Sequence, residues 1–222
     1  MRRQFSLCIL GLVFASGPVL AGPTLYGPSG LIEMPTAESL RYKEFNVAAD
    51  YVIDPLYPTA NSLYYKANLG TFKGWEMGVV GGRVPTEGVF LNLKYYLMSD
   101  ETRYPVSIAI GLERLASIQN SSIYLVASKL FQDGLSLHFG FRATMVNQEL
   151  DATVMGGAAY YVTNALGLMA DVVGQGKTYR VNAGVQYAIT EWLTIRGALY
   201  DAFSANTAGP QYSAGFAVSK FL

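Results

Sequence analysis

The sequence predicts an all-β fold, a transmembrane up-and-down antiparallel β-barrel of about 12 strands. Two observations predict it. Short segments in which apolar and polar residues alternate follow one another after residue 44, and a related turn motif recurs between several of them. Alternation with a period of two places the apolar side chains on one face of a strand and the polar side chains on the other.

The turn motif recurs along the second half of the chain. It consists of an aromatic or branched residue, a polar pair and an alternating apolar run, at residues 131–137, 162–168 and 189–195, with a looser copy at 70–77. Each copy is typical of a tight reversal between two strands, so we expect consecutive strands to be antiparallel neighbours.

Twelve alternating segments follow residue 44, separated by clusters of Asp, Asn, Gly, Ser and Pro, which tolerate turn conformations. The expected strands are 45–53, 61–69, 75–82, 88–98, 105–113, 121–131, 135–144, 152–162, 166–173, 177–188, 192–202 and 210–222. Segments of about ten residues are long enough to cross the apolar core of a bilayer when tilted. In 121–131 and 152–162 the alternation is too poor to fix which side chains share a face.

The composition of the two faces distinguishes a membrane barrel from a soluble barrel, in which the apolar residues would point inward. The apolar face carries long, branched and aromatic side chains, and the polar face carries Gly, Ala, Ser, Asn and Tyr with a few charges of both signs. A soluble barrel needs an exterior rich in Lys and Glu. Charged residues make up only 14% of this chain, against roughly 25% in an ordinary soluble domain. We therefore expect lipid against the apolar face and a polar lumen.

Aromatic residues gather near the expected ends of the strands, as in the interfacial belts of membrane barrels. One group is Tyr95, Tyr96, Phe131, Tyr160, Tyr161 and Tyr187, and the other is Tyr51, Tyr124, Tyr179, Tyr200, Phe203 and Tyr212. Tyr is also a common strand residue, so a belt is one of two interpretations. An even strand number places turns near 71–74, 99–104, 132–134, 163–165 and 189–191 on the periplasmic side.

The sequence divides into three parts, 1–21, 22–44 and 45–222. Arg2 and Arg3 precede an apolar stretch that ends in Val19-Leu20-Ala21, the pattern of a cleaved secretory signal. Cys8 is the only cysteine and lies in this signal, so we expect no disulfide in the mature protein. Residues 22–44 are expected to fold into the barrel mouth as a plug or to lie against the periplasmic rim, with a flexible lead as the alternative.

The most distinctive sequence in the second part is residues 26–37, Tyr-Gly-Pro-Ser-Gly-Leu-Ile-Glu-Met-Pro-Thr-Ala. It resembles the N-terminal signature of the YjbH-type outer-membrane proteins associated with exopolysaccharide and capsule secretion, in which Gly-Leu-Ile-x-x-Pro-Thr-Ala leads into the first barrel strands. The matching residues are Gly30, Leu31, Ile32, Met34, Pro35, Thr36 and Ala37. Glu38 stands where the family often has arginine. The resemblance implies an outer-membrane location and a tie to surface polysaccharide, and it carries over no catalytic residue.

Polar residues on the inward face are expected to line the lumen. They are Asp50, Lys66, Glu76, Lys94, Glu113, His138, Arg142, Asp171, Arg180 and Arg196. In one interpretation, side chains of opposite sign pair across a narrow barrel and fill it. In the other, they form a constriction that selects small polar solutes or contacts sugar, with Tyr64, Tyr96 and Tyr200 as stacking surfaces.

An enzymatic interpretation depends on His138 and Ser136. With a nearby acid, the pair would follow the nucleophile logic of lipid hydrolases. Same-face neighbours on one strand have Cβ atoms about 7 Å apart, further than a hydrogen bond, although their side chains can lean together. An isolated His on a polar barrel face is typically a hydrogen-bonding residue, so we expect no catalytic residue and no cofactor. With one His and no Cys in the mature protein, we also expect no metal site such as a zinc site. The formal net charge is 0, which offers no general attraction to nucleic acid.

Together with the resemblance, these observations predict a non-enzymatic barrel of the bacterial outer membrane, a structural or pore-type component linked to exopolysaccharide or capsule export. A small general outer-membrane channel or scaffold without a polysaccharide role is the alternative, and a lipid-modifying barrel enzyme is a remote one. The expected partners are outer-membrane lipid, the barrel-assembly machinery, and polysaccharide or export-complex proteins.

Overall fold

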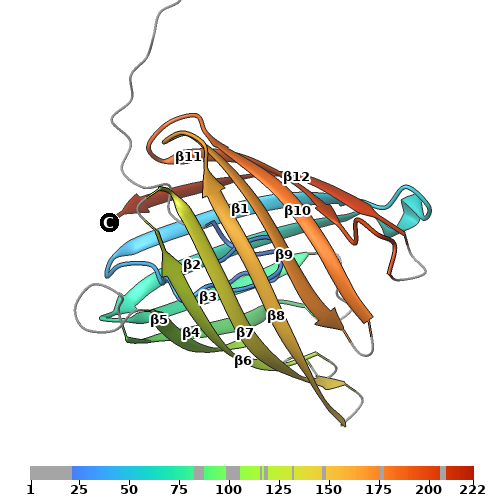
Figure 1. Cartoon of the computed structure of the whole chain (residues 1–222), viewed down its shortest axis with the longest axis horizontal. Coiled ribbons are helices and arrows are strands. Elements are labelled where there is room, and N and C mark those ends of the chain that lie inside the picture. Colours follow the sequence, from blue (N-terminus) through green and yellow to red (C-terminus); the bar gives the residue numbers. More distant parts are fainter. Residues whose placement is uncertain are drawn as a thin grey trace, which may run out of the picture.

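The computed structural model describes residues 22–82, 88–98, 106–115, 117, 120–131, 133–146, 149–175, 178–205 and 209–222. The expected signal, 1–21, lies outside the described residues. The rest forms a closed antiparallel barrel of twelve strands (Figure 1), which confirms the predicted fold. The strands are β1 (Glu44–Ile53), β2 (Ser62–Phe72), β3 (Trp75–Gly82), β4 (Phe90–Met98), β5 (Ser107–Leu115), β6 (Ser122–Leu130), β7 (Leu135–Val146), β8 (Glu149–Tyr161), β9 (Leu166–Gln175), β10 (Thr178–Ala188), β11 (Leu193–Tyr200) and β12 (Gln211–Phe221).

The barrel is closed by its first and last strands. Every strand pairs with the next one along the chain, and β1 also pairs with β12 in a register that runs from Glu44 opposite Phe221 to Ile53 opposite Tyr212. Closure gives each strand a partner on both sides, so no sheet edge is left with unpaired backbone groups.

The two ends of the barrel differ in what they carry. The terminal rim is the end at which β1 begins and β12 ends, and the described turns 73–74, 162–165 and 189–192 lie there. The distal rim is the opposite end, at which β1 ends and β12 begins, and it carries the described connection 54–61 with a short 3-10 helix, Pro58–Ala60. That the terminal rim faces the periplasm stays a prediction.

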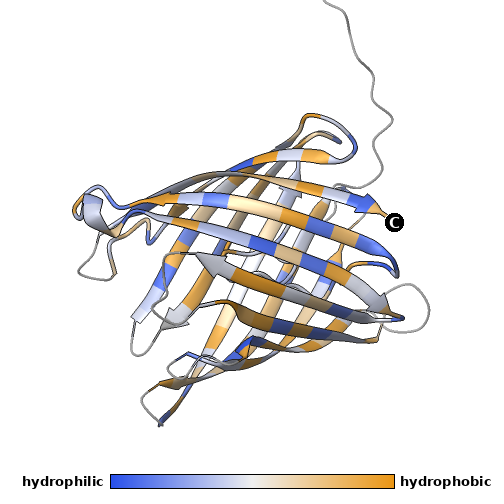
Figure 2. Cartoon of the chain, turned by 180° about the vertical axis from the view of Figure 1, so that it is seen from behind, coloured by the Kyte–Doolittle hydropathy of each residue, from blue (hydrophilic) through white to orange (hydrophobic). Residues whose placement is uncertain are grey.

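The outer face of the barrel is apolar. Hydropathy alternates along the strands (Figure 2), and the outward positions carry large exposed side chains that include Val47, Leu63, Met77, Leu91, Ile110, Leu125, Leu137, Phe139, Phe141, Leu168, Val185, Ile195 and Phe216. Among the described residues, no helix has the length and apolar character needed to cross a membrane.

The structure fixes the two strands whose phase the sequence left open. On β6, Ser122, Tyr124, Val126 and Ser128 are buried and point inward, while Ile123 and Leu125 are exposed. On β8, Met155 and Ala159 are buried. The placement of Tyr124 and Tyr200 in an outer aromatic belt was wrong, since both are buried inside the barrel.

Candidate functional site: the lumen and its plug

Residues 22–40 run through the interior of the barrel, and we call this segment the plug (Figure 1). Nearly every plug residue is buried, and Glu38 is the exposed exception. The segment begins beside Arg196 and Gln186 and ends beside Gly70, residues of the terminal half of the barrel. The plug therefore enters from the terminal rim and returns to it.

The plug satisfies part of its own backbone by folding back on itself. Gly30 N–H donates to the Gly22 carbonyl (2.9 Å) and Leu31 N–H donates to the Met34 carbonyl (2.9 Å). Gly30 lies so close to its neighbours that an added Cβ would stand 2.3 Å from the Met34 carbonyl oxygen. A glycine is required at this point of the motif because the two backbone segments touch.

Apolar plug residues complete two hydrophobic clusters with the barrel wall. Met34 and Ala37 pack with wall residues in a first cluster: Ala109, Tyr124, Val126, Met155 and Val173. Leu25 and Ile32 pack with Val52 and Tyr200 in a second. Full burial of one such large side chain stabilises the docked plug by about 1.5–3 kcal/mol relative to exposure. The core of this molecule therefore lies between plug and wall.

Asp171 of β9 holds the middle of the plug. Its Oδ2 accepts three successive backbone N–H groups, from Ile32 (3.0 Å), Glu33 (2.8 Å) and Met34 (3.0 Å). Its Oδ1 accepts a hydrogen bond from the Asn182 side chain (2.7 Å). A carboxylate that receives several N–H donors in a buried site forms strong, charge-assisted hydrogen bonds.

Glu76 of β3 and Lys94 of β4 hold both ends of the motif. The Glu76 carboxylate accepts Ser29 N–H (2.8 Å), Ser29 Oγ–H (2.6 Å) and Leu40 N–H (3.0 Å). The Lys94 ammonium lies 3.6 Å from Glu76 Oε2. It also donates to plug carbonyls, those of Ser29 (2.8 Å), Thr36 (3.2 Å) and Glu38 (2.7 Å). Glu76 thus binds backbone N–H groups of the plug, and Lys94 binds its carbonyl groups.

Glu33 is the buried charge that the plug itself brings into the lumen. Its carboxylate forms an ion pair with Arg180 of β10 (2.8 Å) and accepts a hydrogen bond from Asn182 (3.3 Å). Its carbonyl accepts a hydrogen bond from Arg142 of β7 (3.0 Å), which also pairs with Glu113 of β5 (3.1 Å). An isolated buried carboxylate is costly, and here it has basic and amide partners.

A third ion-pair group lies beside the start of the plug. Asp50 of β1 pairs with Lys66 of β2 and, through its other oxygen, with Arg196 of β11 (3.0 Å). Arg196 also donates a hydrogen bond to the Pro23 carbonyl. The two strands that flank β1 and β12 are therefore tied across the seam, and the same arginine contacts the plug.

All ten polar residues expected in the lumen thus lie inside the barrel. Arg180 and Arg196 are half-buried and the other eight are buried. His138 bridges two serines, with Nδ1 2.7 Å from Ser128 Oγ and Nε2 3.0 Å from Ser136 Oγ. Ser128 Oγ also accepts the N–H of Ala37 (2.9 Å). Both ring nitrogens thus face hydroxyl groups of wall serines, with Ser136 and His138 closer than the spacing of their Cβ atoms implies, and Ser128 is the residue that binds the plug.

Sequence reasoning did not identify several side chains that bind the plug. Asn68 donates to the Gly27 carbonyl (2.7 Å) and Asn92 donates to the Tyr26 carbonyl (2.9 Å). Ser128 and Asn182 were missed in the same way. A search restricted to charges overlooks them, although Asn and Ser at inward positions of a strand are a usable signal.

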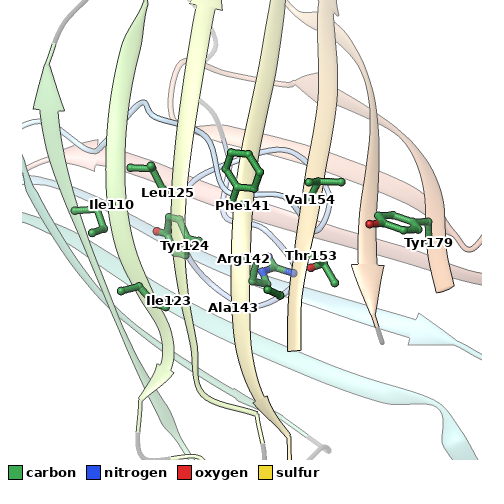
Figure 3. Close-up of a pocket in the computed structure, with 11 residues that line it drawn as sticks. Ile110, Ile123, Tyr124, Leu125, Phe141, Arg142, Ala143, Thr153, Val154 and Tyr179 are labelled. Atoms are coloured by element: carbon green, nitrogen blue, oxygen red, sulfur yellow. The ribbon is translucent and has the colours of Figure 1, made fainter. Parts of the chain in front are cut away.

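A hollow of about 370 Å³ opens on the outer wall, and the inward residues Tyr124, Arg142 and Thr153 are among those that line it (Figure 3). It lies over the small side chains Ala143 and Ala152, and outward apolar residues surround it: Ile110, Ile123, Leu125, Phe141, Val154 and Tyr179. Within the described residues, no group of three or more His, Cys, Asp and Glu side chains is arranged to hold a metal ion.

The architecture defines a class, a small closed β-barrel of porin-like fold whose lumen contains its own N-terminal segment. A KdgM porin is 12% identical and matches with a TM-score of 0.61 over 80% of this chain and 99% of that chain. A NanC porin is 13% identical, with a TM-score of 0.54 over the same shares. A KdgM porin in complex with disordered oligogalacturonate is 12% identical, with a TM-score of 0.60 over 81% of this chain and 99% of that chain. These identities show the fold alone. No family model and no curated protein matches the sequence.

Proposed function

We propose that this protein is a small, non-enzymatic outer-membrane channel whose plug closes the lumen in the state described above and is displaced when solute passes. An apolar outer face supports placement in a membrane, because each strand of the closed barrel pairs with a neighbour on both sides and large apolar side chains face outward. The porin-like fold and the secretory signal pattern support the bacterial outer membrane.

The observation that carries the proposal is the chemistry by which the plug is held. Its backbone is bound by polar wall residues, Asp171, Glu76, Lys94, Asn68 and Asn92, through hydrogen bonds. Water can replace such hydrogen bonds when the plug leaves, at a net cost of about 0.5–1.5 kcal/mol for a neutral one and about 1.5–3 kcal/mol for one to a charged group. A lumen that contains polar and charged side chains remains suited to water and polar solutes after the plug leaves.

Conductance in planar bilayers tests the proposal. The full chain is expected to conduct rarely, and a variant that lacks residues 22–40 is expected to conduct continuously. A locked variant, Ala37→Cys with Ser128→Cys, is chosen because Ala37 N–H donates to Ser128 Oγ (2.9 Å). Its oxidised form should stay closed, and reduction should let it open at least as often as the full chain, because the variant lacks the Ser128 hydroxyl that binds the plug. A silent deletion variant that is still folded would favour the scaffold alternative.

A link to exopolysaccharide or capsule export is a second proposal. It is supported by the resemblance of residues 30–37 to the YjbH-type motif, and these residues belong to the plug. The partners expected from that resemblance are polysaccharide and export-complex proteins, beside outer-membrane lipid and the barrel-assembly machinery. Deleting the gene and measuring surface polysaccharide tests the link, and unchanged polysaccharide would leave the general channel as the function.

A further inference from the structure

Three basic side chains lie at the terminal rim where the chain leaves the plug and enters β1, and we call them the seam patch: Arg41, Lys43 and Lys220. Arg41 and Lys43 belong to the connection between the plug and β1, and Lys220 precedes the last residue of β12. Because β1 pairs with β12, the three residues come from neighbouring backbone segments. All three are exposed, and hydrophilic positions gather beside this end of β12 (Figure 2).

Lys43 has a backbone conformation that favours glycine. Its φ is 66°, in the left-handed region that a residue with a side chain adopts only at an energetic cost. Two hydrogen bonds hold it there, one from Lys43 N–H to the Gly70 carbonyl of β2 (2.8 Å) and one from Leu222 N–H to the Lys43 carbonyl (2.9 Å). Since glycine would fit this backbone better, the turn does not explain the lysine, and its side chain is the feature to be explained.

Lys220 interrupts the apolar outer face of β12. The residue before it, Ser219, faces the lumen, where its Oγ accepts a hydrogen bond from the Asn46 side chain (3.2 Å). Lys220 therefore points outward, beside its partner Phe45 of β1. A lysine at the end of a membrane-crossing strand lays its stem along the apolar surface and holds its ammonium among the lipid headgroups.

Charge on the outer side of this seam is mostly positive. None of the ion pairs of the described residues includes a member of the seam patch. Glu44 is in electrostatic range of Arg41, but it is buried on the inward face of β1, and its Oε2 accepts Arg41 N–H (2.9 Å). Glu191, in the turn 189–192, is exposed beside the end of β12. Three exposed positive charges thus lie near one exposed negative charge.

Exposed apolar side chains accompany the seam patch at the same end of the barrel. Tyr42 is 60% exposed, and its ring centroid lies 5.4 Å from the Lys43 ammonium. Phe72 at the end of β2, and Phe221 and Leu222 at the end of β12, are also exposed. Aromatic residues next to basic ones at the end of membrane-crossing segments are typical of the boundary between acyl chains and headgroups.

We propose that the seam patch binds the phosphate group of an anionic phospholipid in the membrane leaflet at the terminal rim, with Tyr42, Phe72 and Phe221 against its acyl chains. Charge complementarity favours this occupant, because exposed basic side chains attract a phosphate, and a zwitterionic headgroup brings a cation of its own. This inference rests on the membrane placement of the proposed channel and names the class of lipid that its terminal rim recognises.

Lipid retention tests the site. The full chain is placed in nanodiscs of equal parts dioleoylphosphatidylglycerol and dioleoylphosphatidylcholine, transferred to detergent and analysed by native mass spectrometry. The two lipids have the same acyl chains, so the ratio in which they are retained reports the headgroup alone. We expect a preference for phosphatidylglycerol of at least about tenfold, since each basic side chain near an anionic surface contributes about fivefold. Equal retention of the two lipids would overturn the proposal.

Inorganic phosphate distinguishes a lipid site from a site for free anions. An excess of phosphate should leave the phosphatidylglycerol bound, because free phosphate cannot replace the apolar contacts of the acyl chains. Release of the lipid by phosphate would show that the patch binds any small anion and would overturn the assignment to a lipid.

Variants separate the site from a general charge effect. Lys220→Gln should lower the lipid preference about fivefold, and the triple variant with Arg41→Gln and Lys43→Gln should abolish it. Lys129→Gln is the matched control, because Lys129 likewise precedes the last residue of its strand, β6, and should keep the full preference. An equal loss in Lys129→Gln would refute the assignment.

Lys43→Gly tests whether Lys43 acts through its side chain. Glycine suits the left-handed backbone, so the urea midpoint should stay the same or rise while the lipid preference falls about fivefold. An unchanged preference in this variant would remove Lys43 from the site.

The lipid site and the channel function can fail separately. A lipid preference in a protein whose plug-deleted barrel does not conduct would overturn the channel function and leave this site standing. Conductance of the plug-deleted barrel with equal retention of both lipids by the full chain would overturn this site alone.

Discussion

Three successive amide groups of the plug converge on one carboxylate oxygen of Asp171. Replacing Asp171 by Ala leaves these buried donors without an acceptor, which costs about 1–3 kcal/mol for each group that water does not reach. We expect Asp171→Ala to weaken plug docking by about 3 kcal/mol, roughly a hundredfold in the closed-to-open ratio. Single-channel open probability measures this ratio.

Two further variants make the Asp171 prediction specific. Asp171→Asn keeps one acceptor oxygen and should fall between the full chain and Asp171→Ala. Asp133→Ala removes a carboxylate from an exposed turn at the terminal rim, where its contact is to Leu135 N–H (3.3 Å), and should leave the open probability unchanged. An Asp171→Ala channel as closed as the full chain would show that the apolar clusters alone hold the plug.

Asp54, just after β1, organises the first distal connection. A hydrogen bond from Gln211 and the N–H groups of Tyr57 and Leu56 hold the pKa of Asp54 below its ordinary value. Since the pKa is lower in the folded loop, the charged carboxylate stabilises the loop above the ordinary pKa of about 3.9. This stabilisation is lost as pH falls through the lowered value.

Amide chemical shifts of Leu56 and Tyr57 in micelles should therefore change with a midpoint below the ordinary range of an aspartate. Asp54→Asn should abolish the transition, because the amide does not titrate. A midpoint at or above the ordinary value would contradict the hydrogen-bond pattern.

At the residue scale, inward charges were predictable and their partners were not. Alternation assigns Lys94 and Arg142 to the polar face directly, because each lies between apolar neighbours on its strand. The inward position of Arg114 was not predicted, because a β-bulge in β5 reverses the direction of its side chain. The alternation of apolar and polar residues does not reveal such an extra residue. Glu33 was not predicted as a lumen residue, because its ion pair with Arg180 depends on the position of the plug inside the barrel.

Among the strands, tyrosines lie over glycines on neighbouring strands. The Tyr124 ring covers Gly111, where an added Cβ would stand 2.3 Å from the ring. Tyr65 covers Gly81 at 2.4 Å in the same manner on the outer face. Aromatic side chains placed over strand glycines fix the register of curved sheets.

Gly111→Ala should destabilise the barrel by about 1–3 kcal/mol, since the ring of Tyr124 cannot move without disturbing the first cluster. The cost should fall but not vanish in a Tyr124→Ala background, because the added Cβ still lies 2.8 Å from the Leu93 carbonyl oxygen; urea unfolding in lipid vesicles can measure this as a double-mutant cycle. Gly156→Ala is the matched control, because nothing lies within 4 Å of its added Cβ. Equal stabilities of Gly111→Ala and Gly156→Ala would contradict the packing argument.

The strand limits expected from the sequence agree with the observed elements within three residues, because alternation between turn residues is a strong signal. The two uncertain phases have a physical cause. Much of β8 consists of Ala and Gly, Ala152, Gly156, Gly157, Ala158 and Ala159, and small side chains fit either face. On β6, Tyr124 and Val126 face inward, so both of its faces are partly apolar.

The whole molecule consists of a barrel wall and a plug, and the charged side chains of the plug are all of one sign. Residues 22–40 contain Glu33 and Glu38 and neither Lys nor Arg. The wall residues that bind the plug include three basic ones, Lys94, Arg142 and Arg180, and two acidic ones that bind its N–H groups, Asp171 and Glu76. Among these residues the basic side chains are in excess, and Arg180 pairs with Glu33 of the plug. Oppositely charged surfaces attract each other at a distance before they dock.

A synthetic peptide of residues 22–40 should therefore block the plug-deleted barrel when added from the terminal-rim side, since both ends of the plug lie at that rim. A Glu33→Gln peptide should block more weakly because it lacks the ion pair with Arg180, and a scrambled peptide of the same composition should not block. Conductance traces with the peptide added to each chamber in turn measure this. Block from the distal side alone would reverse the direction of plug insertion.

The position of the plug could not be chosen from the sequence alone. Its apolar residues and turns predict packing, but whether it fills the mouth or lies on the rim depends on partners contributed by strands spread from β1 to β11. Those partners are brought together only when the ring closes. The strands of the wall can be predicted from local sequence patterns, whereas the position of the plug depends on residues far apart in the sequence.

Pairing of β1 with β12 has a consequence for biogenesis. The ring joins its ends through residues 211–221, so a nascent chain stopped before this segment would present β1 and β11 as bare edges, which recruit strands from other molecules. β12 is thus the strand that converts an open, aggregation-prone sheet into a closed barrel, and the barrel cannot close until this strand has been made.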